Sequence, residues 1–227
     1  MLNTLGARTG TYSNILELRY ESAFLLIATA ALAVPDRAVL RFEDIRDEVL
    51  MVRLFDSLGP QLVTGTTQPI ADALREDWSV ANQIHSMLLS LWGHRYLIER
   101  GYLDSRESAS LYPAFLVPAL ARLRGGLSNS PSQGSTYVLN RLINAGAIHA
   151  DSEGHLTIDA ERAHAEVVRA ANEFISAMAS GDANTVHALL RQYVVVHPRM
   201  QSVLERMGPA PPLHRLVYRT ADQLDAP

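Results

Sequence analysis

The sequence contains neither cysteine nor lysine, and all 20 of its basic residues are arginine. Without cysteine, the chain cannot form disulfides, use a thiolate nucleophile or bind a metal through sulfur, so it is compatible with a reducing compartment. Without lysine, it cannot form a lysine Schiff base with a carbonyl substrate. These two absences exclude several classes of redox and covalent chemistry.

Long apolar runs and basic clusters are also missing. The best candidate for a targeting or membrane segment runs from Ser22 to Val34, and it is too short to span a bilayer. The net charge of -4 is modest, and no stretch interleaves basic with aromatic residues. We therefore expect a cytoplasmic protein that binds neither nucleic acid nor a membrane.

Helical periodicity dominates what is present. With 227 residues, 48% of them apolar, the chain can bury a sizeable core, and we expect one domain over residues 1–227. An irregular arm over 1–13 and an extended Pro-rich tail over 208–227 flank it. Residues 147–159 break the helical rhythm and indicate a small β-hairpin. Apolar spacing bounded by Gly, Pro or Asp predicts a mostly α fold, with helices over 14–34, 36–57, 70–100, 105–124, 133–145, 160–180, 182–193 and 197–206.

The segment 49–60 reads VLMVRLFDSLGP. It resembles the active-site helix of bacterial dipeptidyl-peptidase III-like zinc metallopeptidases, which typically reads Leu-Met-His-Glu-Leu-Ser-His-Gly-Leu-Gly-Pro. In that family, two histidines four residues apart hold zinc on one helix face, beside a glutamate that acts as general base. The resemblance places Val52 and Asp56 at the histidine positions and Arg53 at the glutamate position.

Two further segments resemble the same family. Residues 84–101 are similar to the helix that carries the third zinc ligand, a glutamate whose position corresponds to Gln83, while its supporting acid corresponds to Met87. Residues 123–148 are similar to a stretch whose arginine is kept as Arg124, whereas its glutamate and histidine correspond to Asn129 and Pro131.

This resemblance covers about residues 1–210. It implies the helical catalytic subdomain of a zinc metallopeptidase that has lost its zinc ligands and its general base. We expect no metal, no cofactor and no zinc-dependent peptidase activity.

Several candidate residues also have a purely structural interpretation. Arg53 and Asp56 are three apart on a helix, so they could form an ion pair at the floor of a cleft or an ordinary exposed pair. His85 and His94 lie on different faces of one helix and are expected to be structural or exposed. Trp78, Trp92 and Tyr96 lie on one long helix, where core packing is the favoured role and an aromatic wall for a ligand is the alternative.

Two functional hypotheses follow. In the first, the chain is a metal-free enzyme that promotes cyclisation or isomerisation of a small, largely apolar molecule in a biosynthetic pathway, with Arg53 and Asp56 as catalytic residues. The ligand would contact Val52, Phe55, Gln83, Met87, Arg124 and Asn129. In the second, the chain is a non-catalytic pseudopeptidase that binds a ligand or a partner. A homodimer would be compatible with either hypothesis.

Overall fold

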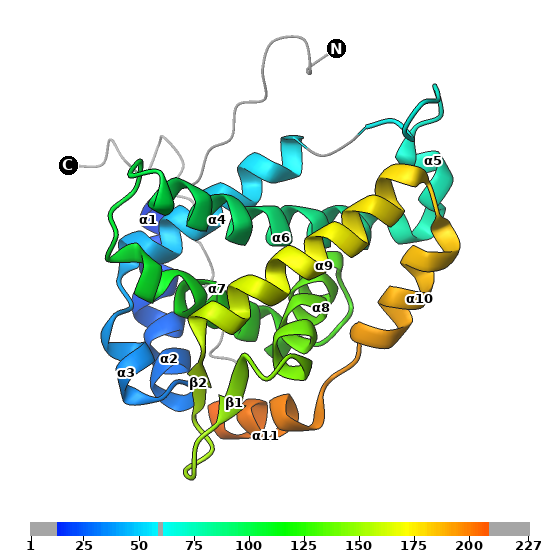
Figure 1. Cartoon of the computed structure of the whole chain (residues 1–227). Helices are drawn as coiled ribbons and strands as arrows, with labels where there is room; N and C mark the ends of the chain where they lie inside the picture. The colour runs from blue at the N-terminus through cyan, green and yellow to red at the C-terminus, as the bar shows by residue number, and fades with distance from the viewer. Residues whose placement is uncertain (1–12, 59–60, 209–227) are drawn as a thin grey trace, which may run out of the picture.

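Two long helices, α6 (Trp78–Glu99) and α9 (Ala160–Ser180), run side by side across the computed structural model in Figure 1. The structure describes residues 13–58 and 61–208. The stretch predicted as one helix over 70–100 is divided into α5 (Ile70–Leu74), a 3₁₀ turn (Arg75–Asp77) and α6. The division falls at Arg75, whose φ of 52° is incompatible with a continuous α-helix.

Three more helices pack around α6 and enclose most of the core: α4 (Phe42–Leu58), α7 (Glu107–Arg124) and α8 (Ser130–Asn144). Large side chains that are almost fully buried fill the space between them, including Tyr112, Phe115 and Tyr137. The predicted helices over 105–124 and 133–145 are confirmed to within a few residues.

The N-terminal helical region is α1 (Ser13–Arg19), a π-helical turn (Tyr20–Phe24) and α2 (Leu25–Ala31), which together match the helix predicted over 14–34. The next predicted helix, over 36–57, is instead two helices, α3 (Val34–Ala38) and α4. The interruption lies at 39–41, where the Asp44 carboxylate accepts a hydrogen bond from the backbone N–H of Arg41 at 2.9 Å and caps α4.

The predicted hairpin is confirmed as two antiparallel strands, β1 (Ile148–Ala150) and β2 (Leu156–Ile158), in the register Ile148 to Ile158. Gly154 lies in the turn with a φ of +82°, a region that favours glycine. The hairpin docks on the end of α2, where the N–H of Ala33 donates to the carbonyl of Leu156 at 2.9 Å.

The C-terminal part contains α10 (Ala183–Tyr193) and α11 (Pro198–Met207), close to the predicted boundaries. In Figure 1, α11 lies beside the hairpin, and Arg206 donates to the carbonyl of Gly154. The predicted arm over 1–13 and tail over 208–227 fall outside the described residues, apart from Ser13 and Gly208. Within the described ranges, no helix combines the length and apolarity that a bilayer crossing requires.

Candidate functional site

The crossing of α4 and α6 brings together positions that the sequence comparison treats as zinc ligands. The Asp56 carboxylate on α4 accepts hydrogen bonds from three side chains of α6: Asn82 at 2.6 Å, Gln83 at 3.3 Å and Ser86 at 3.3 Å. Two residues that bind one metal ion must have side chains close to each other, as those of Asp56 and Gln83 are. The structure therefore supports the alignment of these two helices with the peptidase motifs.

Apolar side chains fill the rest of this crossing. Val52 lies one turn before Asp56 on α4, Met87 one turn after Gln83 on α6, and their residues are only 9% and 1% exposed. Phe55 is half-buried and packs close to Gly93, whose missing Cβ would come within 2.8 Å of the ring. Val52 and Met87 belong to the packed interior. Neither of the two hollows described below is lined by Val52, Phe55 or Met87.

The residues at the crossing do not fit a catalytic zinc ion, which needs three protein ligands with available lone pairs. Val52 has no lone pair to offer. Asp56 already accepts three hydrogen bonds, and Gln83 directs its amide nitrogen at Asp56. Among the residues that the structure describes, no three His, Cys, Asp or Glu side chains lie together so that they could hold a metal.

Three other predicted site residues lie outside this polar contact. Arg53 is exposed and, within the described ranges, does not form the expected ion pair with Asp56, because the carboxylate turns towards α6 instead. Arg124 donates to the carbonyls of Met207 and Gly208, both at 2.9 Å, and so caps α11. Asn129 caps α8 by accepting from the N–H of Ser132 at 2.9 Å.

Beneath the crossing lies a buried polar group that sequence reasoning missed. Glu48, one turn before Val52 on α4, is 1% exposed, and neither carboxylate oxygen has a hydrogen-bond partner in the described part of the chain. Burial raises the pKa of Glu48 to about 7, although the positive charge of Arg122 opposes the shift. Arg122 itself donates to the hydroxyl of Ser135 at 3.3 Å. Glu48 occurs in the sequence Arg46-Asp47-Glu48, which is typical of a solvated helix face, so its burial could not be foreseen.

Two histidines of α6 are buried, as structural residues would be. Burial lowers the pKa of His85 to about 4, against the opposing effect of the Asp56 charge, so its imidazole is neutral at pH 7. His94 contacts the carboxylate of Glu107 through Nε2 at 2.9 Å. His85 therefore places a neutral ring close to Asp56, and His94 joins α6 to the first turn of α7.

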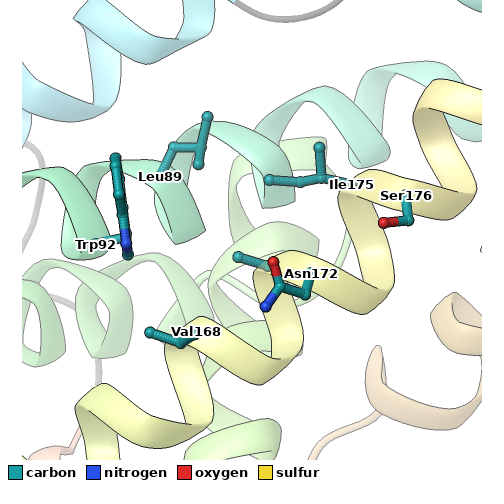
Figure 2. A pocket seen from close by; sticks show the side chains of 7 residues that line it. Leu89, Trp92, Val168, Asn172, Ile175 and Ser176 are labelled. Atoms are coloured by element: carbon teal, nitrogen blue, oxygen red, sulfur yellow. The ribbon is translucent and has the colours of Figure 1, made fainter. Parts of the chain in front are cut away.

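A shallow concavity lies between α6 and α9, on the side of α6 that Figure 2 shows. We call this hollow of about 330 Å³ the α6–α9 groove. Its walls are largely apolar, and none of its lining residues is charged. The groove is lined by Leu89 and Trp92 of α6 and by Val168, Ala171, Asn172, Ile175 and Ser176 of α9.

The aromatic side chains beside this groove support the aromatic-wall interpretation, not core packing. Trp92 and Tyr96 are each 40% exposed, and their rings stack with centroids 5.5 Å apart and an interplanar angle of 15°. The guanidinium of Arg100 lies over the Tyr96 ring, 5.2 Å from its centroid. The four-residue intervals between Trp92, Tyr96 and Arg100 indicate a shared helix face, so this arrangement is visible in the sequence.

A second hollow, of about 390 Å³, lies near the start of α9 and the end of α8. It is lined by Ala145, Arg162, Ala165, Glu166 and Arg169. Its charged groups already have partners: Glu166 accepts from Arg141 and Arg169, and Arg162 pairs with Asp159. This hollow therefore offers fewer free binding groups than the α6–α9 groove.

The helices around the crossing of α4 and α6 are arranged as they are in solved peptidase structures. More narrowly, the chain resembles part of dipeptidyl-peptidase III. It is 28% identical to that enzyme from Corallococcus sp. strain EGB, with a TM-score of 0.81 over 86% of this chain and 36% of the other. The enzyme from Caldithrix abyssi has the same fold, at 22% identity and a TM-score of 0.83 over 87% of this chain and 38% of the other.

A curated relative is Nudix hydrolase 3 of Arabidopsis thaliana, 22% identical over 197 residues. The match covers 86% of this chain but 26% of the plant protein, so this chain corresponds to about a quarter of that relative. No protein-family model matches the sequence.

Proposed function

We propose that this chain is a peptidase-like domain that binds a small, largely apolar molecule in the α6–α9 groove and does not hydrolyse peptides through zinc. The observation that carries this proposal is the contrast between two places on α6. At the former ligand positions, Val52, Asp56 and Gln83 are engaged in packing and hydrogen bonds. On the other side of the helix, the groove is open and uncharged.

The size and lining of the groove support a small molecule as the ligand. A volume of about 330 Å³ lies at the lower end of the range for ligand pockets, roughly 300–1,000 Å³. Such pockets combine apolar walls with a few polar groups that set the orientation of the ligand. Here Leu89, Val168 and Ile175 form apolar walls, and Asn172 and Ser176 supply the polar groups.

A thermal-shift screen of neutral small molecules tests this proposal. We expect some compounds to raise the melting temperature of the wild-type protein, because a ligand at 100 times its Kd stabilises the folded state by about 2.7 kcal/mol. The variant Asn172→Phe should abolish these shifts, because the larger side chain fills the groove.

The matched control is Asn144→Phe, the same substitution at an exposed position on α8 that does not line the groove. It should respond to ligands like the wild type. Equal shifts in all three proteins would show that the compounds bind elsewhere, and the proposal would then be wrong.

Catalysis of cyclisation or isomerisation by Arg53 and Asp56 stays a prediction. One arrangement favours it: the three donors from α6 fix the Asp56 carboxylate, which is close to the neutral imidazole of His85. A fixed carboxylate near a neutral imidazole can move a proton in general acid–base catalysis. Once a substrate is identified, Asp56→Ala should lower its turnover by about 10²–10³-fold. Turnover at the wild-type rate would leave only the binding function.

A further inference from the structure

A stack of flat groups lies at one end of the α6–α9 groove, and Trp92 is the member of the stack that lines the groove. Trp92, Tyr96 and Arg100 follow one another at four-residue intervals along α6, with the Trp92 and Tyr96 rings nearly parallel. Tyr96 lies one turn beyond Trp92, whereas the lining residue Leu89 lies one turn before it. Tyr96 therefore covers one face of the Trp92 ring. Figure 2 shows the ring edge-on at the end of the groove, with its other face towards the remaining lining residues.

We propose that the groove selects a neutral, flat aromatic compound, whose ring stacks on the free face of Trp92 and whose polar edge is hydrogen-bonded by Asn172 and Ser176. This inference rests on the proposed function, because it names the class of ligand for the same groove. A flat ring placed there extends the existing stack by one member. Offset stacking of this kind adds to the gain from burying apolar area.

The polar groups of α9 are suited to the edge of such a ring. Asn172 and Ser176 are four residues apart, so both side chains lie on the same face of α9. An amide can both donate and accept a hydrogen bond, as can a hydroxyl. Several helical hydroxyls, such as that of Ser22, donate to the carbonyl of the preceding turn. Within the described ranges, neither Asn172 nor Ser176 makes a side-chain hydrogen bond of its own, so both remain available.

The absence of charge along the lining explains why the ligand should be neutral. The seven lining residues include no acidic or basic side chain, so the groove offers no partner for an ionised group. Moving an unpaired charge against apolar walls is costly. A hydroxyl, amide or ring N–H would instead satisfy Asn172 and Ser176 at little cost.

A pair of probes that differ only in aromaticity tests the inference by calorimetric titration of the full chain. 2-Naphthol is flat and carries one hydroxyl, whereas decahydro-2-naphthol has the same carbon skeleton and hydroxyl without the flat ring. We expect 2-naphthol to bind the wild type roughly three- to tenfold more tightly. Trp92→Leu should remove most of this preference, whereas Trp92→Phe should keep part of it.

The outcomes separate the inference from the function on which it rests. Equal affinity for both probes, with both lost in Asn172→Phe, would overturn the aromatic preference and leave the groove as a binding site. A preference for 2-naphthol that survives Trp92→Leu would also overturn it. Tighter binding of anionic 2-naphthoate would contradict neutrality. The wild type could instead be a homodimer that binds neither probe. If Trp92→Leu then made the protein monomeric, the groove would be a contact between two copies of the chain, and the inference would be wrong.

Discussion

Glu48 shows how a single buried residue can make the stability of the fold depend on pH. Its carboxylate is buried and has no hydrogen-bond partner among the residues that the structure describes, at a depth where charged groups are usually paired. The positive charge of Arg122 lowers the pKa of Glu48 and so favours the ionised carboxylate. The two side chains form no ion pair in the described part of the chain. The protonated form of Glu48 is therefore favoured up to about neutral pH.

The raised pKa of Glu48 predicts that this residue stabilises the protein less as the pH rises. Between the ordinary value of 4.5 and the folded-state value of about 7, the folded protein keeps a proton on Glu48 that the unfolded chain releases. The contribution of Glu48 to the free energy of unfolding should therefore fall by about 3 kcal/mol over this interval. The lowered pKa of His85 acts in the opposite direction below pH 6.5, so the difference between the wild type and Glu48→Gln isolates the contribution of Glu48. Glu48→Gln cannot ionise, so it should match the wild type near pH 4.5 and be more stable at pH 8.

Chemical denaturation of both proteins across this pH range measures the effect. Glu43→Gln is the matched control, because Glu43 belongs to the same helix and is exposed. Its profile should follow that of the wild type. An identical pH dependence in Glu48→Gln would mean that the Glu48 carboxyl is ionised throughout.

At the level of elements, helix ends marked by capping residues or glycine were predictable from the sequence. The breaks within the predicted helices were not. Asp159 caps α9 by accepting from the N–H of Arg162 at 3.0 Å, and Gly181 ends the same helix with a φ of +72°. Both act within one turn, so the sequence displays them. The positive φ of Arg75 and the π-helical turn at Tyr20–Phe24 interrupt segments whose apolar spacing is continuous. Tertiary packing decides such interruptions.

The contact between Asp56 and Gln83 was predictable, whereas its surroundings were not. The resemblance to the peptidase motifs assigned both residues to one site, and their side chains are in contact. A functional role for them stays a prediction. The motifs do not show that the Asp56 carboxylate turns away from Arg53. Residues of α9 such as Val168 and Ile175 were missed for another reason. Apolar periodicity shows which face of a helix is covered, but it does not show whether the neighbouring helix fills that face completely.

Close approach of α8 to α6 depends on Gly134. A Cβ at this position would lie 3.0 Å from the Cβ of Gln83 and 3.4 Å from its backbone carbonyl carbon, neither of which can easily move. We expect Gly134→Ala to lower the free energy of unfolding by about 1–2 kcal/mol through overpacking, despite the gain in helix propensity of about 1 kcal/mol. Denaturant titration measures this change.

Gly93→Ala provides the comparison within the same helix bundle. Its added methyl group meets the ring of Phe55 at 2.8 Å and the Cε atom of Met51 at 3.5 Å, and both belong to side chains that can move. The loss of stability should therefore be smaller than for Gly134→Ala. A larger loss would show that the Phe55 ring is fixed and that the contact between α4 and α6 is the less tolerant one.

For the whole molecule, the retained helix crossing predicts that a metal site can be rebuilt. The triple variant Val52→His, Asp56→His and Gln83→Glu introduces the ligand types of the resembled peptidases. Asp56 and Gln83 are already in contact, and Val52 lies one turn before Asp56 on α4. It should bind about one zinc ion per chain, whereas the wild type should bind none stoichiometrically. Elemental analysis after dialysis measures both.

The variant Val52→His alone is the control, because one added histidine does not complete a three-ligand site. It should bind no more zinc than the wild type. Stoichiometric zinc in the wild-type protein, or hydrolysis of dipeptidyl substrates by it, would mean that the positions were aligned incorrectly. Absence of zinc from a folded triple variant would mean that the crossing differs from that of the peptidases.

The position of Trp92 also gives the protein an optical property. The chain contains two tryptophans, and one of them forms a wall of the groove while Trp78 is half-buried at the start of the same helix. Indole emission moves to shorter wavelength when water leaves the ring, so a molecule that enters the groove should change the colour of the protein's own fluorescence. Because the chain offers no thiol or lysine amine for attaching a dye, this emission is the natural signal by which occupancy of the groove can be followed.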